Sequence, residues 1–237
     1  MWAMHRFWTA GVLARHRWRG RAPLRVRAAN RGNHGAAHEL SAPEMAYRTP
    51  PWLMDWFDRT LRGVLYDADR VVGPHVRASD RVADIGCGAG FYSVALSRLV
   101  GERGEVVLLD AQRSMLDRAV AHCEADPGAT ARLTPLRADG AELPIDGRLD
   151  FALLSWMLHE VDDARTLWAR LAELLAPGGR ALVIEPRLHV SRARYERELA
   201  PAIELGLARQ DVSGIFFSRA ALLCARGRTP NARIPER

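Results

Sequence analysis

Short apolar runs alternate with stretches of helical periodicity along most of the chain, from about Pro50 onward. Short runs rich in Val, Ile and Leu indicate strands, and apolar residues three and four apart indicate amphipathic helices. Strands are predicted over residues 81–85, 106–110, 133–138, 150–156, 181–184 and 215–225. Helices are predicted between them, over residues 91–99, 115–120, 164–175 and 191–206. This alternation predicts βαβ units around a mostly parallel sheet of six or seven strands.

Ahead of the first strand, residues 51–65 place aromatic and aliphatic residues at helical spacing, Trp52, Trp56 and Phe57 among them. We predict a helix here, within a helical cap over about residues 50–75 that covers one end of the sheet. Two roles stay open for its aromatic residues: packing against the sheet, or forming a lid over a substrate pocket. With this cap, residues 45–230 are predicted to form a single domain.

The positive charge is concentrated at the start of the chain. The formal net charge is +6, yet residues 1–38 hold eight arginines and no acid, so the remainder is slightly acidic. For a basic leader over residues 1–44 we consider four interpretations: a disordered extension with translation starting near Met45, an Arg-rich organelle transit peptide, a cleaved secretory signal, or a nucleic-acid-binding arm. We favour the first, because little in this segment can pack.

Composition excludes several classes of chemistry. All 34 basic residues are arginine, so a Schiff-base lysine and the lysine of a Walker-type phosphate loop are both absent. The three cysteines, Cys87, Cys123 and Cys224, form no CxxC pair, so neither a metal site nor a disulfide framework is expected. No apolar run has the length of a membrane-spanning helix. A cytoplasmic protein is predicted, with organelle import as the alternative if the leader is a transit peptide.

The segment VADIGCGAG, residues 82–90, carries the most information about function. It lies directly after a predicted strand and directly before a predicted helix, where glycines allow a sharp turn and let a ligand approach the bare backbone. A dinucleotide fingerprint would space its glycines as GxGxxG, whereas here the third glycine comes two residues after the second. An acid, Asp110, ends the next predicted strand.

The loop resembles motif I of class I S-adenosylmethionine-dependent methyltransferases, with Asp110 at the position of that family's ribose-binding acid. Three later stretches continue the resemblance: RADGAELP at 137–144, FALLSWMLHEVDD at 151–163 and LLAPGGRALVIEP at 174–186. The resemblance covers about residues 70–226 and includes FFSRAALL at 216–223, which is similar to the antiparallel last strand of that fold. It therefore implies a Rossmann-like, seven-stranded, mostly parallel sheet with helices on both faces.

The resemblance also implies the cofactor and the residues that bind it. S-adenosyl-L-methionine is expected, with Asp84 near its amino-acid end, Asp110 on the ribose and Asp139 on the adenine. The full set of cofactor-binding candidates is Asp84, Gly86, Cys87, Gly88, Gly90, Asp110, Ala111, Asp139, Gly140 and Ser155. Cys87 is interpreted as a small packing residue rather than a nucleophile.

The methyl group of this cofactor is already activated, so positioning is the enzyme's main task, and proximity alone can contribute roughly 7–11 kcal/mol. If the acceptor must lose a proton, residues after strand ends are the candidates: His159, Glu160, Glu185 and His189. His159 and Glu185 are taken as the catalytic candidates, and for each a structural alternative stays open: a structural hydrogen bond for His159, and the end of a strand for Glu185. Asp162 and Asp163 are expected to cap the next helix.

In overall style the chain is similar to the small-molecule branch that includes menaquinone and ubiquinone C-methyltransferases, which implies a small organic acceptor. The tetrapeptide after the fourth strand reads Ser155-Trp156-Met157-Leu158, unlike the motifs of families that methylate nucleic-acid bases, so nucleic acid is not expected as acceptor. The cysteines do not match the arsenite methyltransferase pattern either. One alternative of another class stays open, a catalytically silent protein that binds the cofactor or serves as a scaffold. The oligomeric state is not predicted.

Overall fold

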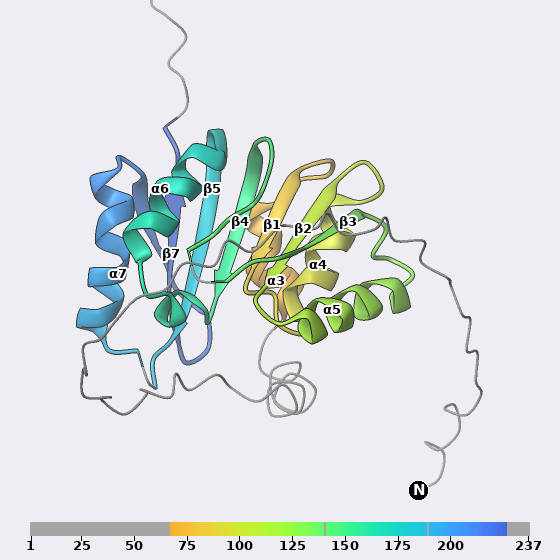
Figure 1. The fold of residues 1–237 in the computed structure, drawn as a ribbon, viewed down its shortest axis with the longest axis horizontal. Helices are drawn as coiled ribbons and strands as arrows, with labels where there is room; N and C mark the ends of the chain where they lie inside the picture. The colour runs from red at the N-terminus through yellow and green to blue at the C-terminus, as the bar shows by residue number, and fades with distance from the viewer. Residues whose placement is uncertain (1–66, 140, 189, 227–237) are drawn as a thin grey trace, which may run out of the picture. The chain divides into compact units, whose positions relative to one another are not determined.

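The computed structural model describes residues 67–139, 141–188 and 190–226, which form a mixed β-sheet with helices packed on it (Figure 1). The strands lie in the order β3-β2-β1-β4-β5-β7-β6. Strands β3, β2, β1, β4 and β5 pair in parallel, and β7 pairs antiparallel with β5 and β6. The strand bounds are β1 Arg81–Ile85, β2 Glu105–Asp110, β3 Arg132–Arg137, β4 Leu149–Ser155, β5 Leu175–Pro186, β6 Ala208–Val212 and β7 Ser218–Cys224.

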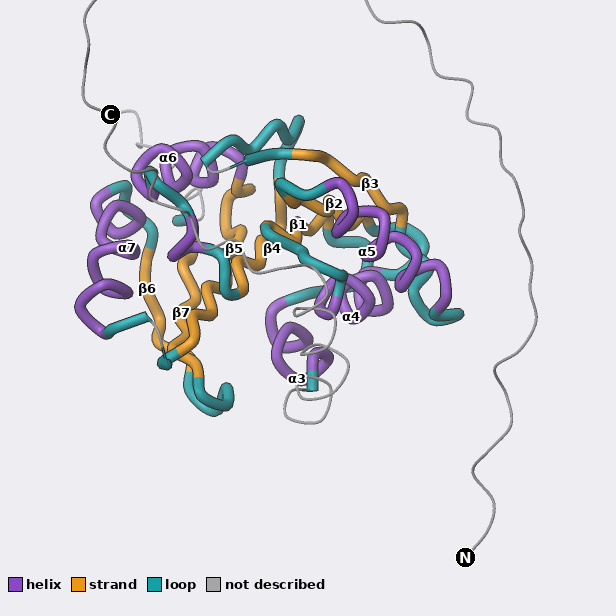
Figure 2. Tube along the Cα trace, turned by 60° about the horizontal axis from the view of Figure 1, so that its bottom comes forward, coloured by secondary structure: helices purple, strands orange, loops and turns teal. Residues whose placement is uncertain are grey.

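Helices cover both faces of the sheet, as Figure 2 shows for α4 and α5 on one side and α6 on the other. Their bounds are α3 Ala68–Val72, α4 Phe91–Val100, α5 Arg113–Ala125, α6 Ala164–Leu174 and α7 Arg192–Glu204, with 3₁₀ turns at Gly73–His75 and Leu158–Glu160. Buried residues of α6 and α7 pack in one hydrophobic cluster, and those of α3, α4 and α5 pack in a second.

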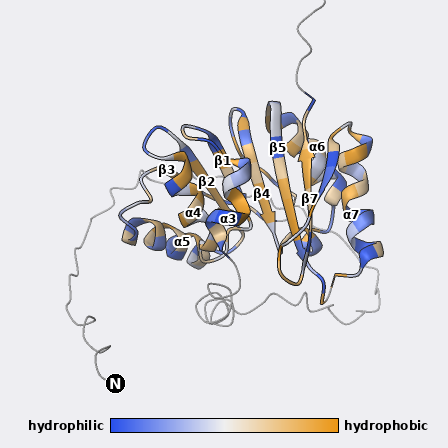
Figure 3. Ribbon diagram, turned by 180° about the vertical axis from the view of Figure 1, so that it is seen from behind, coloured by the Kyte–Doolittle hydropathy of each residue, from blue (hydrophilic) through white to orange (hydrophobic). Residues whose placement is uncertain are grey.

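Alternate residues of each central strand contribute to the two clusters, because successive side chains of a strand point to opposite faces. In β1, for example, Ala83 belongs to the cluster under α6, and Val82 belongs to the cluster under α4. Both faces are therefore buried, which explains why the central strands are apolar along almost their whole length (Figure 3). In the sequence such strands are continuous apolar runs rather than alternating ones.

Cap residues explain where two of the helices begin. The Asp163 carboxylate accepts the Thr166 backbone N–H at 3.0 Å, and the Ser191 hydroxyl accepts the Arg194 N–H at 3.2 Å. Side chains of this type satisfy the otherwise unpaired first N–H groups of a helix. The capping role predicted for Asp163 is therefore confirmed, and so is the helix start predicted at Ser191.

The predicted fold class is confirmed: the sheet has seven strands, is mostly parallel, and has an antiparallel last strand. Two details of the prediction were wrong. Strand β6 was not predicted, because its sequence ARQDV is short and polar and it pairs only with β7. Strand β5 begins at Leu175 rather than Ala181, so the Pro177-Gly178-Gly179 turn lies within its bounds, at an irregularity in its pairing with β4.

The basic leader and the aromatic helix predicted over 51–65 lie outside the described residues, so these remain predictions. The part of the predicted cap that is described, residues 67–75, contains α3 and the first 3₁₀ turn. Among the described residues, no helix has both the length and the apolar character needed to cross a lipid bilayer.

Candidate active site

The predicted site residues gather where β1, β2, β4 and β5 end. These strands are mutually parallel, so their carboxyl ends lie at one edge of the sheet. Open α/β sheets bind their ligands at this edge. The glycine loop follows β1, Asp110 ends β2, Ser155 ends β4, and Glu185 lies one residue before the end of β5.

The three glycines of the loop have positive φ angles of 71°, 52° and 88° at Gly86, Gly88 and Gly90, but they meet different surroundings. A Cβ at Gly86 would lie 2.7 Å from Met157 Cβ, and one at Gly90 would lie 2.7 Å from Ala119 Cα in helix α5. A Cβ at Gly88 would meet no atom within 4 Å. Gly86 and Gly90 therefore allow close packing within the protein, and Gly88 alone faces open space.

Asp110 holds this loop against the start of α5. Its Oδ2 accepts the Gly88 backbone N–H at 3.0 Å, and its Oδ1 accepts the Gln112 N–H at 2.8 Å. Burial raises the pKa of Asp110 above its usual range, and the two backbone hydrogen bonds oppose that rise. Because a carboxylate has about four acceptor positions, these two bonds leave capacity for hydroxyl donors. The role of Gln112 in this arrangement was not predicted, since backbone N–H groups have no signature in the sequence.

Asp84 and Cys87 are buried below the loop. The Ser93 hydroxyl donates to Asp84 Oδ2 at 2.6 Å, which ties strand β1 to helix α4. Burial raises the pKa of the Cys87 thiol well above its ordinary value, and the nearby carboxylates of Asp84 and Asp110 raise it further. A protonated thiol is a poor nucleophile, so these surroundings suit the packing role expected for Cys87, which stays a prediction.

The other cofactor candidates lie along the same edge. Ala111 follows Asp110 directly and is partly exposed, Asp139 is exposed after β3, and Ser155 is buried at the end of β4. Gly140 lies outside the described residues. His122 of α5, which was not predicted, donates from Nδ1 to the Ala89 carbonyl at 2.7 Å and so binds the glycine loop to that helix. The surroundings of Ala111, Asp139 and Ser155 do not determine what each residue binds, so their roles at the cofactor stay predictions.

The turn after β4 lies against the glycine loop. Trp156 has a φ of 58°, which is rare for a bulky residue and indicates a backbone held in place by its surroundings. Its N–H donates to the Ile184 carbonyl at 2.8 Å, and its indole Nε1 donates to the Ser218 hydroxyl at 3.4 Å. The next residue, Met157, is the one that packs over Gly86. The turn is thus positioned by β5, by β7 and by the loop itself.

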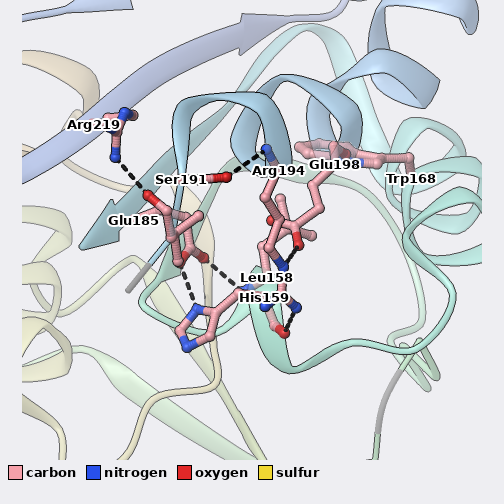
Figure 4. A network of polar contacts seen from close by, with 9 residues as sticks. Leu158, His159, Trp168, Glu185, Ser191, Arg194, Glu198 and Arg219 are labelled. Carbon is pink, nitrogen blue, oxygen red and sulfur yellow. Dashed lines mark hydrogen bonds and ion pairs between the residues drawn. The ribbon is translucent and has the colours of Figure 1, made fainter. Parts of the chain in front are cut away.

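The two predicted catalytic candidates, His159 and Glu185, are in contact (Figure 4). His159 Nδ1 lies 2.6 Å from Glu185 Oε2, and Glu185 Oε1 accepts the Leu158 backbone N–H at 2.8 Å. Glu185 is completely buried, and the His159 side chain is 12% exposed. Burial by itself lowers the pKa of His159, but the hydrogen bond and charge of Glu185, helped by Glu160, outweigh it, and the net shift is upward.

Arg194 of α7 also contacts this turn, donating from Nη2 to the His159 carbonyl oxygen and from Nε to Glu198 at 2.7 Å. Sequence reasoning did not find Arg194, because nothing in the sequence indicates which of the many arginines approaches a site 35 residues away. Of the two remaining base candidates, Glu160 is exposed next to His159 and His189 lies outside the described residues.

A shallow hollow of about 440 Å³ lies at the opposite edge of the sheet, lined by residues 145–148, Arg170, Glu173 and Leu174. Its two arginines are engaged with the backbone: Arg170 donates to the Ile145 carbonyl at 2.9 Å, and Arg148 donates to the Glu173 carbonyl. Within residues 67–139, 141–188 and 190–226, no three His, Cys, Asp or Glu side chains are grouped to hold a metal ion.

The arrangement at the carboxyl edge fits an adenosyl sulfonium. Gly88 offers bare backbone to open space, and the Asp110 carboxylate beside it can accept hydroxyl hydrogen bonds. A seven-stranded sheet of this order, with such a loop after its first strand, is the arrangement that the resemblance to class I S-adenosylmethionine-dependent methyltransferases implies.

Comparison with known proteins agrees with this class. Residues 82–179 match the family described as a methyltransferase domain, which confirms the resemblance found in the sequence. The ubiquinone/menaquinone biosynthesis C-methyltransferase of Proteus mirabilis is 38% identical over 111 residues, covering 46% of this chain and 44% of that protein. The corresponding enzyme of Teredinibacter turnerae is 37% identical over 115 residues, again covering 46% of this chain and 44% of the relative. The chain thus matches less than half the length of these relatives.

Solved structures support the fold. A methyltransferase from Aquifex aeolicus that depends on S-adenosylmethionine superposes with a TM-score of 0.64, covering 75% of this chain and 99% of that one at 21% identity. A methyltransferase from Pyrococcus furiosus superposes with a TM-score of 0.53 at 14% identity, covering 66% of this chain and 79% of that one. At such identities the likeness establishes the fold alone.

Proposed function

We propose that this protein transfers the methyl group of S-adenosylmethionine to a small organic acceptor by in-line displacement. The observation that carries the proposal is the pairing of Gly88 with Asp110: open backbone beside a partly buried carboxylate that still has acceptor capacity. The match of residues 82–179 to the methyltransferase domain family supports it.

In this proposal, Asp110 accepts the ribose hydroxyls, and the backbone of Gly86, Cys87 and Gly88 lies against the cofactor. Asp139 serves the adenine, and Asp84, which Ser93 holds at the end of β1, lies toward the amino-acid end. When bound, S-adenosylmethionine supplies a methyl group on a sulfonium, already activated for transfer. The chain's own task is then to hold the acceptor in line behind that carbon and to exclude water.

A small organic acceptor is supported by the names of the curated relatives, which methylate carbon in ubiquinone and menaquinone biosynthesis. The residues after β4 also lack the motifs of base-methylating families, so we do not propose a nucleic-acid acceptor. A cytoplasmic location remains a prediction from the sequence.

Calorimetry combined with methyl transfer tests the proposal. The full chain is titrated with S-adenosylmethionine and then incubated with methyl-labelled S-adenosylmethionine and a filtered cell extract. We expect saturable binding and label in the small-molecule fraction. Binding without transfer would favour a catalytically silent protein, and the absence of binding would overturn the cofactor assignment altogether.

Gly88→Ala should weaken cofactor binding far more than it weakens the fold. The new methyl group points into the space assigned to the cofactor, and the positive φ adds roughly 1 kcal/mol of strain. We expect the affinity for S-adenosylmethionine, measured by calorimetry, to fall about 10-fold or more, since 1.4 kcal/mol corresponds to a factor of ten.

Gly206→Ala is the matched control for this substitution. Gly206 also has a positive φ, 89°, and a Cβ there would meet nothing within 4 Å, but it lies between α7 and β6, away from the loop. It should cost similar stability and leave the affinity unchanged. Equal affinities of the two variants would place the cofactor somewhere other than above Gly88.

A further inference from the structure

Burying an ionised Glu185 beside His159 costs free energy, and a purely structural hydrogen bond at this position would not require that charge. A carboxylate with no exposed surface incurs a large desolvation penalty, whereas a glutamine could accept the Leu158 N–H and donate to the imidazole without a charge. The negative charge strengthens its hydrogen bonds to neutral donors, but it brings the largest advantage when the imidazole beside it becomes positive. This points to a histidine that takes up a proton during function.

The hydrogen-bond pattern determines which ring nitrogen can take that proton. A carboxylate only accepts hydrogen bonds, so Nδ1 of His159 carries the hydrogen that lies toward Glu185. In the neutral ring the lone pair is then on Nε2, at the ring edge turned away from Glu185 (Figure 4). Glu185 thus selects the tautomer that is a base at Nε2.

The pair is also held next to the proposed cofactor loop. Met157, two residues before His159, packs over Gly86, and Arg194 binds the His159 carbonyl from α7. Glu185 fixes the intervening backbone through the Leu158 N–H. The backbone that carries His159 is therefore held from β5, from α7 and from the glycine loop, and Glu185 of β5 orients the imidazole itself, as a proton acceptor requires.

We propose that His159, oriented by Glu185, accepts the proton of a phenolic or enolic hydroxyl on the methyl acceptor. We further propose that this oxygen takes the methyl group, in contrast to the carbon methylated by the relatives named C-methyltransferases. The proposal rests on the proposed function. In the step, the hydroxyl proton passes to Nε2 of His159 and the oxygen lone pair forms the O–C bond to the methyl group. The S–C bonding pair remains on sulfur, which becomes a neutral thioether.

The chemistry of the step selects a base and the acceptor class. The departing sulfur loses its positive charge, so it needs no general acid. A titrating imidazole at the site is therefore useful only as a general base for the acceptor. Neutral amines and ionised thiols or carboxylates attack without losing a proton first. Among hydroxyl groups, a phenol has a pKa of about 10, which is much closer to the pKa of an imidazole than the pKa of an aliphatic alcohol is.

The pH dependence follows from the charged groups around the ring. Glu185 and Glu160 raise the pKa of His159, while burial and Arg194 lower it, and the net shift is upward from the usual value of 6.5. A base must be unprotonated to act, so kcat/KM should fall as the pH drops through this raised pKa. Glu185→Gln should move that acid limb to lower pH and lower the plateau as well, because the amide favours the wrong tautomer.

The experiment has three parts, made on the full chain as wild type, His159→Gln and Glu185→Gln. Calorimetry should give all three the same affinity for S-adenosylmethionine within about 3-fold. An NMR titration should place the pKa of the His159 ring above 6.5 in wild type and lower it in Glu185→Gln. Transfer from methyl-labelled S-adenosylmethionine to phenol should fall about 100-fold or more in His159→Gln, in the range usual for a lost general base.

A second probe separates proton removal from positioning. 4-Nitrophenol is already ionised at pH 8 and needs no base, so its methylation should fall less than about 10-fold in His159→Gln. Two controls lie at the far edge of the sheet: His75→Gln and Glu105→Gln, the latter removing another buried carboxylate. Both should leave the His159 titration and the transfer to phenol unchanged.

The outcomes are distinguishable. Failure of wild type to bind S-adenosylmethionine overturns the proposed function itself. Binding with no transfer to either probe overturns the acceptor class, and equal losses on phenol and nitrophenol overturn the role as base. If His159→Gln does not fold, Glu185→Gln decides, since its amide oxygen can still accept the Leu158 N–H; an unshifted acid limb in that variant contradicts the proposal.

Discussion

Replacing Asp110 with alanine is expected to lower the affinity for S-adenosylmethionine about 100-fold or more. Hydrogen bonds to a charged group contribute roughly 1.5–3 kcal/mol each, and two ribose hydroxyls are expected to share this carboxylate. The substitution also removes the acceptor for the Gly88 and Gln112 N–H groups, which loosens the loop that carries the cofactor. Titration calorimetry with the folded variant measures the loss.

Two further variants separate the ribose contact from general damage. Asp110→Asn keeps an oxygen acceptor of the same shape without the charge, so its affinity should lie between those of wild type and the alanine variant. Asp117→Ala removes an exposed carboxylate of α5 that pairs with Arg113, and it should leave the affinity unchanged. Unaltered binding in Asp110→Ala would mean that the nucleoside is held elsewhere.

The sequence predicted best where a local pattern decides the outcome. Strand β1 lies over Arg81–Ile85 as predicted, and helix α4 begins at Phe91 as predicted and ends at a glycine cap, Gly101, because apolar runs and glycine caps act within a few residues. Strand β6 was missed since its short polar sequence becomes a strand only by pairing with β7. A strand that depends on one distant partner leaves little trace in its own residues.

At the candidate site, residue identity was predictable and contact was not. His159 and Glu185 were each marked by their position after a strand end, yet their hydrogen bond joins residues 26 apart in the chain. The packing roles of two loop glycines could not be predicted from the sequence: Gly86 leaves space for Met157, and Gly90 leaves space for Ala119. Of the three loop glycines interpreted as ligand-facing, Gly88 is the one beside open space.

This division of roles predicts that Gly90→Ala damages the fold rather than the site. The new Cβ would lie 2.7 Å from the backbone Cα of Ala119, so helix α5 must shift, and the φ of 88° adds strain for any residue with a side chain. Overpacking and backbone strain each cost about 1–3 kcal/mol, so we expect a loss of about 3 kcal/mol in the free energy of unfolding. Thermal unfolding should show it as a fall of roughly 10 °C in Tm.

Gly206→Ala separates the two causes, because Gly206 has nearly the same φ of 89° and no atom within 4 Å of a Cβ. Gly206→Ala introduces the backbone strain but no steric overlap, so it should lower the free energy of unfolding by only about 1–2 kcal/mol. The difference between the two variants then measures the approach of α5 to the glycine loop. That approach sets where Asp110 and Gln112 meet Gly88, so Gly90→Ala should also weaken cofactor binding, in proportion to the displacement of α5. Equal stabilities of the two alanine variants would show that α5 can move away without cost and that Gly90 does not determine its position.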